Sequence, residues 1–194
     1  MAILVEPVFN DMPFSLPAHI ETSRLIIRLV EENDIPNLFD VNGDDEVTLY
    51  LPYETWQTIE DGNNWYERMC SLHATNTVLQ FVIVEKESDR VIGSCLLFRL
   101  EEASARAEIG YVMGRAYWKK GFTFEALSGL VKYAFEDCSL RRLEAEIDPR
   151  NVASNKLISK LGFVHEGLLR QRWFAKEETS DSNIYGLLSE EFSS

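Results

Sequence analysis

The stretch Tyr117-Trp118-Lys119-Lys120-Gly121-Phe122-Thr123-Phe124-Glu125-Ala126 decides the fold that the sequence predicts. Residues 106–113 before it alternate between apolar and polar side chains, as a half-buried strand does. After it, apolar residues recur every four positions at Phe122, Ala126, Leu130 and Ala134, which predicts a helix with one apolar face. A helix N-terminus carries unpaired backbone N–H groups and the positive end of the helix dipole. Two lysines and a glycine at this end therefore predict a binding site for an anion such as phosphate.

The anion site is weakly specified by this stretch alone, because Lys-Lys-Gly before a helix is common. One glycine falls short of a G-x-G-x-x-G fingerprint, and the chain contains no G-x-x-x-x-G-K-S/T loop. A Rossmann-like nucleotide or flavin unit is disfavoured as well, since no acidic ribose-binding residue follows a glycine fingerprint.

A second strand and helix follow. Residues 142–148 alternate as a strand, and Pro149 ends it because proline cannot donate to the strand ladder. Asn151 is suited to cap a short helix, and Gly162 is suited to close it. The long helix before residue 142 then acts as a right-handed crossover between two parallel strands.

This order of elements resembles the GNAT superfamily of acyl-CoA N-acetyltransferases, and within it the RimJ/RimL-like branch, the ribosomal-protein-alanine N-acetyltransferases. The resemblance covers the chain from about Ile20 onward. The stretches that carry it are Glu21–Arg28, Ala107–Tyr111, Trp118–Ala126, Asn151–Asn155, Lys160–Phe163, Glu166–Arg170 and Tyr185–Leu188.

The resemblance implies an α+β (mixed α/β) fold: a mostly antiparallel, twisted central sheet with one splayed parallel strand pair, and helices on both faces. Residues 19–194 are expected to form a single domain, and residues 1–18 an N-terminal arm. Further strands are expected at 24–29, 78–84, 91–100, 164–174 and 183–188, and helices after Glu31 and at 58–73. Residues 175–182 are expected to be a polar loop.

The resemblance also implies acetyl-CoA as co-substrate. Backbone groups of Tyr111, Val112 and Met113 are expected to bind its pantetheine arm. The remaining expected cofactor-binding residues are Lys119, Lys120, Gly121, Phe122, Thr123 and Phe124, for the pyrophosphate, and the side chains of Asn151 and Asn155. Two positions depart from the family's acyl-CoA motif. Trp118 stands where the motif begins with a polar residue, and Thr123 stands where the motif ends with a small residue. Asn151 also has an ordinary role available as a helix cap.

Direct acetyl transfer needs a proton donor for the leaving thiolate and a base for the amine, but no metal. Many family members use a tyrosine as donor where this chain has Ile158, so the resemblance directs us to Ser154, one turn earlier. Glu146 and Glu108 are the rival candidates for the base, and a water relay could replace either. Each also has an ordinary reading, Ser154 as a first-turn helix residue and the glutamates as solvent-facing strand positions.

The composition of the chain limits the kinds of partner and binding site that are expected. The 194-residue chain has a net charge of −13, which argues against nucleic-acid binding, and no apolar run approaches the ~20 residues needed to span a bilayer. The first residues lack the basic start and apolar run of a secretory signal, so we expect a cytoplasmic protein. The three histidines are scattered without cysteine or carboxylate companions, so no metal site is expected. A homodimer is left open.

The acceptor is predicted from one acidic segment. Residues 29–67 hold eleven carboxylates and no lysine or arginine. They are either a solvated face or the wall of an acceptor site that attracts cations. The second reading predicts the N-terminal amine of a basic protein such as a ribosomal protein, with a small amine (polyamine, aminoglycoside or amino acid) as the alternative. A degenerate, non-catalytic domain of the same fold is a further alternative.

Overall fold

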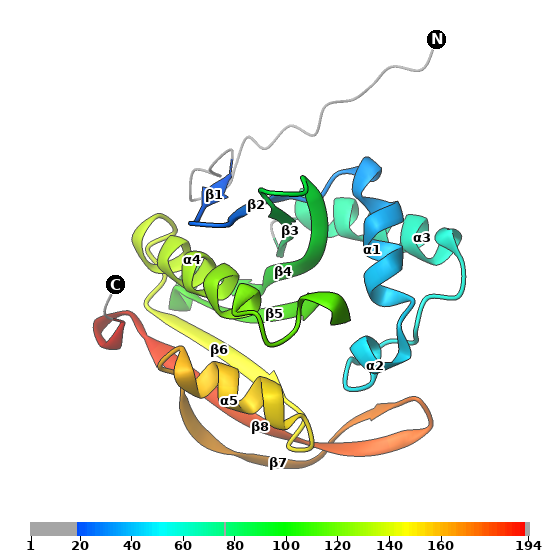
Figure 1. The fold of residues 1–194 in the computed structure, drawn as a ribbon. Coiled ribbons are helices and arrows are strands. Elements are labelled where there is room, and N and C mark those ends of the chain that lie inside the picture. The colour runs from blue at the N-terminus through cyan, green and yellow to red at the C-terminus, as the bar shows by residue number, and fades with distance from the viewer. Residues whose placement is uncertain (1–18, 76, 193–194) are drawn as a thin grey trace.

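The computed structural model describes residues 19–75 and 77–192 and places them in one layered fold (Figure 1). The expected N-terminal arm, residues 1–18, lies outside the described residues. An eight-stranded sheet has the order β1-β2-β3-β4-β5-β6-β8-β7. The strands are β1 (Ile20–Glu21), β2 (Leu25–Leu29), β3 (Val78–Glu85), β4 (Arg90–Glu101), β5 (Arg106–Met113), β6 (Arg142–Ile147), β7 (Val164–Ala175) and β8 (Glu178–Leu188).

The helices that cover the sheet are α1 (Ile35–Asn42), α2 (Asp45–Thr48), α3 (Ile59–Ala74), α4 (Phe122–Glu136) and α5 (Val152–Lys160). Short 3-10 turns follow β4 and β5, at Glu102–Ser104 and Arg115–Tyr117. Two of the helix starts follow directly from the sequence. Thr58 and Asp61 form a capping box at α3, and the Asn151 side chain accepts a hydrogen bond from the Ser154 N–H at α5.

The sheet is covered on both faces because β3 is apolar on both. Leu79, Phe81 and Ile83 alternate with Val82 and Val84 along it, and all five side chains are buried. The first set belongs to the core that contains Leu127, Leu130 and Val131 of α4. The second set packs with Ile35 and Leu38 of α1. The predicted α+β architecture, with helices on both faces, is therefore confirmed (Figure 1).

The pairing of β5 with β6 is the one parallel pair in the described sheet. Its register joins Arg106 to Arg142, Ala107 to Leu143 and Glu108 to Glu144, and goes no further. Beyond these residues β5 stays paired with β4, while β6 stays paired with β8. The two strands thus diverge as expected, and we call the place where their pairing stops the fork.

One sequence expectation was wrong: residues 175–182 are not a polar loop. β7 and β8 pair up to Ala175 and Glu178, so only Lys176 and Glu177 form the turn. Both have positive φ, 53° and 60°, which is the geometry of the tight two-residue hairpin turn whose twist matches that of the strands. The polar residues 178–182 belong to β8. They pair with β7 alone, because the pairing of β8 with β6 begins only at Asn183, and Glu178 and Thr179 are exposed whereas Ser182 is buried.

Candidate active site

The Lys119–Phe124 loop enters α4 through left-handed backbone. Lys119 has φ 60° and Gly121, the N-cap of α4, has φ 83°. No described side chain caps the helix at this point. The first N–H groups of α4 therefore have no intrahelical acceptor, and the helix dipole favours an anion beside them.

Glu125, in the first turn of α4, anchors this loop to the start of β2. Its Oε1 accepts hydrogen bonds of 2.7 Å from the Thr22 hydroxyl and from the Arg24 N–H, and its Oε2 accepts one of 2.7 Å from Arg24 Nε. Arg24 also donates to the Lys120 carbonyl at 3.1 Å and lies over the Phe122 ring. Burial acts to raise the pKa of Glu125, but these hydrogen bonds from Arg24 and Thr22 hold it below its ordinary value. The Glu21–Arg28 stretch thus fixes the loop.

Trp118, which replaces the motif's first polar residue, ties the loop to the end of β5. Its indole N–H donates a 2.7 Å hydrogen bond to the Met113 carbonyl. The loop is therefore held at both ends, by Trp118 on β5 and by Glu125 on β2. One lone pair of the Met113 carbonyl, expected from the resemblance to serve pantetheine, already has this protein partner.

On the face of the sheet that carries α4 and α5, two hydroxyl groups meet across the fork. The Tyr111 hydroxyl on β5 is hydrogen-bonded to the Ser154 hydroxyl in the first turn of α5. Burial raises the pKa of Tyr111 to about 12, although the hydrogen bond to Ser154 acts against it. Tyr111 was expected to act through its backbone alone, and no residue pattern indicated that its side chain would pair with Ser154.

Asn155, predicted to bind the cofactor, has its hydrogen-bonding capacity filled by the protein. Its amide N–H groups donate to the Asp148 carbonyl at 3.0 Å and the Asn151 carbonyl at 2.7 Å. Its oxygen accepts from Asn183 at 2.9 Å and from the Tyr185 hydroxyl at 2.8 Å. Two donors and two lone pairs are all that an amide offers. This geometry favours a positioning role for Asn155, in which it holds the turn between β6 and α5 against β8.

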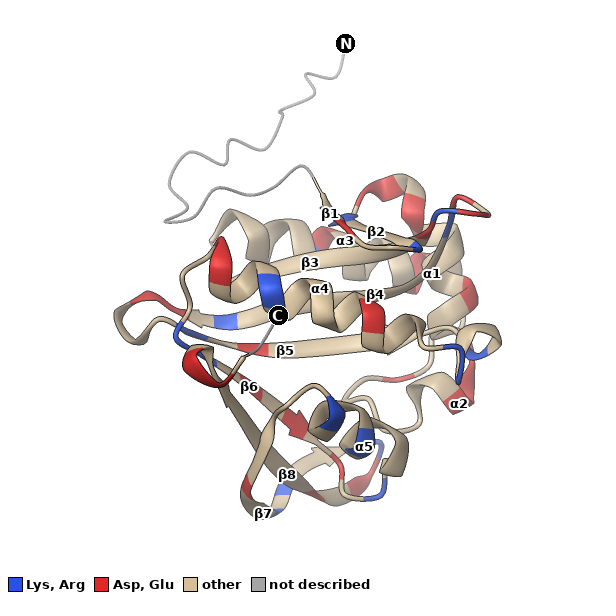
Figure 2. Ribbon diagram, turned by 60° about the vertical axis from the view of Figure 1, so that its left-hand side comes forward, with Lys and Arg blue, Asp and Glu red and all other residues tan. Residues whose placement is uncertain are grey.

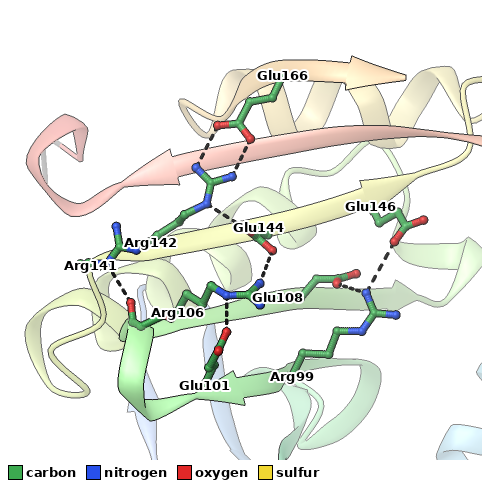
Figure 3. A network of polar contacts seen from close by, with 10 residues as sticks. Arg99, Glu101, Arg106, Glu108, Arg141, Arg142, Glu144, Glu146 and Glu166 are labelled. Carbon is green, nitrogen blue, oxygen red and sulfur yellow. Dashed lines mark hydrogen bonds and ion pairs between the residues drawn. The ribbon is translucent and has the colours of Figure 1, made fainter. Parts of the chain in front are cut away.

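The two glutamates lie together on the opposite face of the sheet. Their neighbours Ala107, Ile109, Ala145 and Ile147 are buried in the core on the α4 side, so Glu108 and Glu146 point to the other side. Arg99 joins them: its Nη1 lies 2.6 Å from Glu108 Oε2 and 3.6 Å from Glu146 Oε2 (Figure 3). Both carboxylates are almost fully buried.

Their environments differ. The pKa of Glu108 is raised, because burial raises it more than Arg99 lowers it and because the nearby Glu146 also raises it. Glu146 instead accepts two hydrogen bonds on Oε1, from Arg172 Nε at 3.0 Å and from the Trp173 indole at 2.7 Å. Among the described residues, Glu108 is thus the less heavily bonded of the pair.

Bulges in β4 and β7 direct the side chains that contact Glu108 and Glu146. In β4, Arg99 and Leu100 stand opposite the single residue Ala107, and Arg99 has φ 51°. In β7, residues 170–172 stand opposite Asp181 alone, and Gln171 has φ 48°. Bulges of this kind re-aim side chains and are frequent beside active sites. Nothing in the residue pattern indicated Arg99, Arg172 or Trp173, because a bulge leaves no reliable signal in hydrophobic alternation.

A ladder of ion pairs continues away from the fork on the same face. Arg106 pairs with Glu101 at 2.6 Å and with Glu144 at 2.9 Å. Arg142 pairs with Glu144 at 2.8 Å and holds Glu166 with two hydrogen bonds (Figure 3). These contacts lie where β5, β6 and β8 are regularly paired. We therefore assign them to holding the sheet together.

The acidic segment covers the end of β5 on the carboxylate side. Val47 of α2 packs with Val112 of β5, and Lys176 at the β7–β8 turn donates to the Thr48 carbonyl at 2.7 Å. Acidic residues recur along α1, α2 and α3 in Figure 2. Part of this charge is neutralised by cations from outside the segment, as the Asp44–Arg115 pair at 2.8 Å shows. A surface hollow of ≈ 410 Å³ remains, lined by Phe39, Asp40, Gly43, Asp44, Asp45 and Arg115.

Two negative findings apply to the described residues. None of the helices within 19–75 and 77–192 is long and apolar enough to cross a membrane. In the same part of the chain, no three His, Cys, Asp or Glu side chains come together as metal ligands would.

Comparison with known proteins identifies similar chains. The sequence profile of the Acetyltransferase (GNAT) domain matches residues 24–164. The uncharacterized N-acetyltransferase p20 of Bacillus licheniformis is 36% identical over 171 residues, which are 88% of this chain and 96% of that protein. The ribosomal protein uS5-alanine N-acetyltransferase of Escherichia coli strain K12 is 26% identical over 157 residues, 76% of this chain and 79% of that enzyme.

A solved structure shows the same fold. The spermidine N-acetyltransferase of Vibrio cholerae, in complex with CoA and spermine, matches with a TM-score of 0.77 at 20% identity and covers 88% of this chain and 98% of that one.

Proposed function

The chain belongs to the GNAT family of N-acetyltransferases, and we propose that it moves an acetyl group from acetyl-CoA directly to a primary amine at the fork between β5 and β6. The observation that carries this proposal is the arrangement at the fork. A pair of hydroxyl groups, Tyr111 and Ser154, lies on one face, and a pair of carboxylates, Glu108 and Glu146, lies on the other. A thioester placed between the strands would have a proton donor on one side and a base on the other.

The cofactor is proposed to enter from the α4 and α5 side. Beyond Glu108, β5 has no pairing with β6, so backbone groups at Tyr111–Met113 are available to the pantetheine amides. The N–H groups at the start of α4 suit the pyrophosphate, and Lys119 and Lys120 add positive charge. Asn151 caps α5 through its oxygen and keeps its amide nitrogen for a ligand, whereas Asn155 holds the turn in place.

The proposed reaction balances with these groups. The amine arrives as an ammonium ion and gives one proton to Glu108, whose raised pKa makes it a better acceptor at neutral pH. The neutral amine attacks the thioester carbon, a C–N bond forms and the C–S bond breaks. The leaving thiolate takes a proton from the Ser154 hydroxyl, and Tyr111, hydrogen-bonded to Ser154, replaces that proton. The acetylated nitrogen releases its second proton to solvent, and solvent returns a proton to Tyr111, so the products are the neutral amide and the CoA thiol, with the first proton on Glu108. No covalent enzyme intermediate is required.

For the acceptor we propose a cationic amine, and first the N-terminal amine of a basic protein such as a ribosomal protein. Support comes from Asp45 and Glu46 on α2, which packs against the end of β5 through Val47. A field of one sign near a site raises the association rate of oppositely charged ligands. A polyamine is the second candidate, favoured by the acidic hollow beside α2, which is large enough for a narrow polycation.

An acceptor assay tests this proposal. Release of free CoA thiol from acetyl-CoA is followed with a basic peptide beginning with alanine, with spermidine, and with a neutral peptide as control. We expect the basic peptide to give the highest kcat/KM. A higher kcat/KM for spermidine than for the basic peptide would indicate that the acceptor is a polyamine. Absence of turnover with every amine, although acetyl-CoA binds, would leave a non-catalytic domain of this fold.

A further inference from the structure

Arg99 lies between the carboxylates of Glu108 and Glu146, a position that another cation could occupy. One nitrogen of its guanidinium group, Nη1, contacts Glu108 at 2.6 Å and lies 3.6 Å from Glu146. The two carboxylates are 9% and 6% exposed, whereas the Arg99 side chain is 45% exposed. The anions are therefore fixed in the protein, and the cation between them is the part that solvent reaches.

The charges around this place balance only while Arg99 is present. Glu108 and Glu146 contribute two negative charges, and Arg99 and Arg172 contribute two positive ones. Glu144, the next carboxylate on this face, is already matched by Arg106 and Arg142. If Arg99 moves away, Arg172 remains on Glu146, and Glu108 is left as one uncompensated buried charge. A buried charge of that kind is strongly unfavourable unless another cation replaces the first.

We propose that Arg99 holds the place of the acceptor's ammonium group, and that a primary ammonium ion of a single charge displaces it to bind between Glu108 and Glu146. The inference rests on the proposed function and adds the residue that selects the acceptor. Arg99 can leave without a change in the fold, because it lies in a bulge and is partly exposed. The ammonium ion then donates its proton to Glu108, the same group that it pairs with.

Competition between Arg99 and the acceptor ammonium group for the two glutamates can be measured as a change in the affinity for an amine. An amine that binds must first displace Arg99. The apparent affinity for the amine is therefore the intrinsic affinity multiplied by the fraction of molecules in which Arg99 has left the glutamates. Removing Arg99 opens the place in every molecule. An arginine that only supported the glutamates would have the opposite effect, because its loss would weaken the site.

The test uses butylammonium as the probe, with protein saturated with CoA and 13C-labelled at glutamate side chains. Its dissociation constant is read from the carboxyl resonances of Glu108 and Glu146 in the wild type, Arg99→Met and Arg99→Lys. We expect Arg99→Met to bind butylammonium about tenfold more tightly, as would follow if the place is open about one tenth of the time. Arg99→Lys should stay near the wild type, because it keeps the cation.

Arg106→Gln is the matched control. It removes an arginine from the same face, but from the regularly paired part of the sheet, and should leave the dissociation constant unchanged. Equal or weaker binding by Arg99→Met, or tighter binding by the control, would overturn the inference. If Arg99→Met does not fold, Arg99→Gln takes its place. Calorimetry of acetyl-CoA on each variant separates the two claims, because absent cofactor binding would count against the proposed function and not against Arg99.

Discussion

The Tyr111 hydroxyl on β5 is hydrogen-bonded to the Ser154 hydroxyl on α5, so a hydroxyl pair joins the two elements that flank the fork. A group that protonates the leaving thiolate acts in the transition state and adds little to ground-state binding. Ser154→Ala should therefore lower kcat by about a hundredfold while the KM for acetyl-CoA stays nearly constant. Steady-state kinetics check this.

Ser159→Ala is the control for that substitution, since it removes a hydroxyl from the same helix that is exposed and bonded only to the Asn155 carbonyl. Tyr111→Phe should resemble Ser154→Ala but with a smaller loss. Full activity of Ser154→Ala would remove the hydroxyl pair from the mechanism.

The raised pKa of Glu108 predicts the acidic limb of the pH–rate profile. The base works as a carboxylate, so kcat/KM should fall as the pH drops through a value above the ordinary pKa of glutamate. Glu108→Gln should abolish this limb together with most of the activity, and Glu146→Gln should lower activity but keep the limb. A limb that disappears only in Glu146→Gln would make Glu146 the base.

The same shift makes a prediction about stability. Because burial makes folded Glu108 hold its proton more tightly than the unfolded chain does, ionising it disfavours the fold. Its contribution is therefore most favourable below the ordinary pKa and declines as the pH rises through the raised one. Denaturant titrations across this window should show that decline in the wild type and a weaker one in Glu108→Gln. An unchanged pH dependence in the variant would contradict the assignment.

Gly121 tests the cofactor site. Its φ of 83° is strained for any β-branched residue, so Gly121→Val should distort the Lys119–Phe124 loop and weaken acetyl-CoA binding at least about tenfold. Gly167→Val serves as the control, since a Cβ there meets nothing within 4 Å and the residue lies on β7. Calorimetry on folded variants gives both affinities. Equal affinities would place the pyrophosphate elsewhere.

The acidic residues on α2 test the acceptor class. Asp44 is unsuited to the test because it caps α2 and pairs with Arg115, so its loss would disturb the structure. Asp45→Lys with Glu46→Lys should raise the KM for a cationic acceptor several-fold and leave that for acetyl-CoA unchanged, and added salt should act in the same direction.

The control for that pair is Glu87→Lys with Glu102→Lys, which changes the net charge equally at two exposed positions outside the acidic segment. The same increase in both double variants would mean that only the total charge matters. No increase in either would make the acidic segment a solvated face.

Local signals predicted the parts of this molecule that depend on neighbouring residues. Asn151 caps α5 as its position indicated, and α3 lies within one residue of the helix expected at 58–73. The fork followed from the resemblance of the whole chain and not from any one motif. The hairpin at 175–182 was missed because polar composition suggested a loop, although residues 178–182 pair as a strand with β7 beyond the part of β8 that pairs with β6.

The parts that could not be predicted depend on contacts between distant residues. Glu108 and Glu146 were singled out as rivals, yet their shared partner Arg99 reaches them only because β4 bulges at that position. Asn155 was assigned to the cofactor from the resemblance, and its four protein partners, which come from residues 148–151 and 183–185, could not be foreseen. Hydrogen bonds of this kind have no periodicity that a sequence pattern could reveal.

Binding of acetyl-CoA at the fork is tested by calorimetry of acetyl-CoA with the wild-type protein. We predict one molecule bound per chain, with an affinity that falls in Gly121→Val and is unchanged in Ser154→Ala. If millimolar acetyl-CoA produced no heat of binding with the folded wild type, the proposed reaction would have no co-substrate and acetyl transfer at the fork would be contradicted.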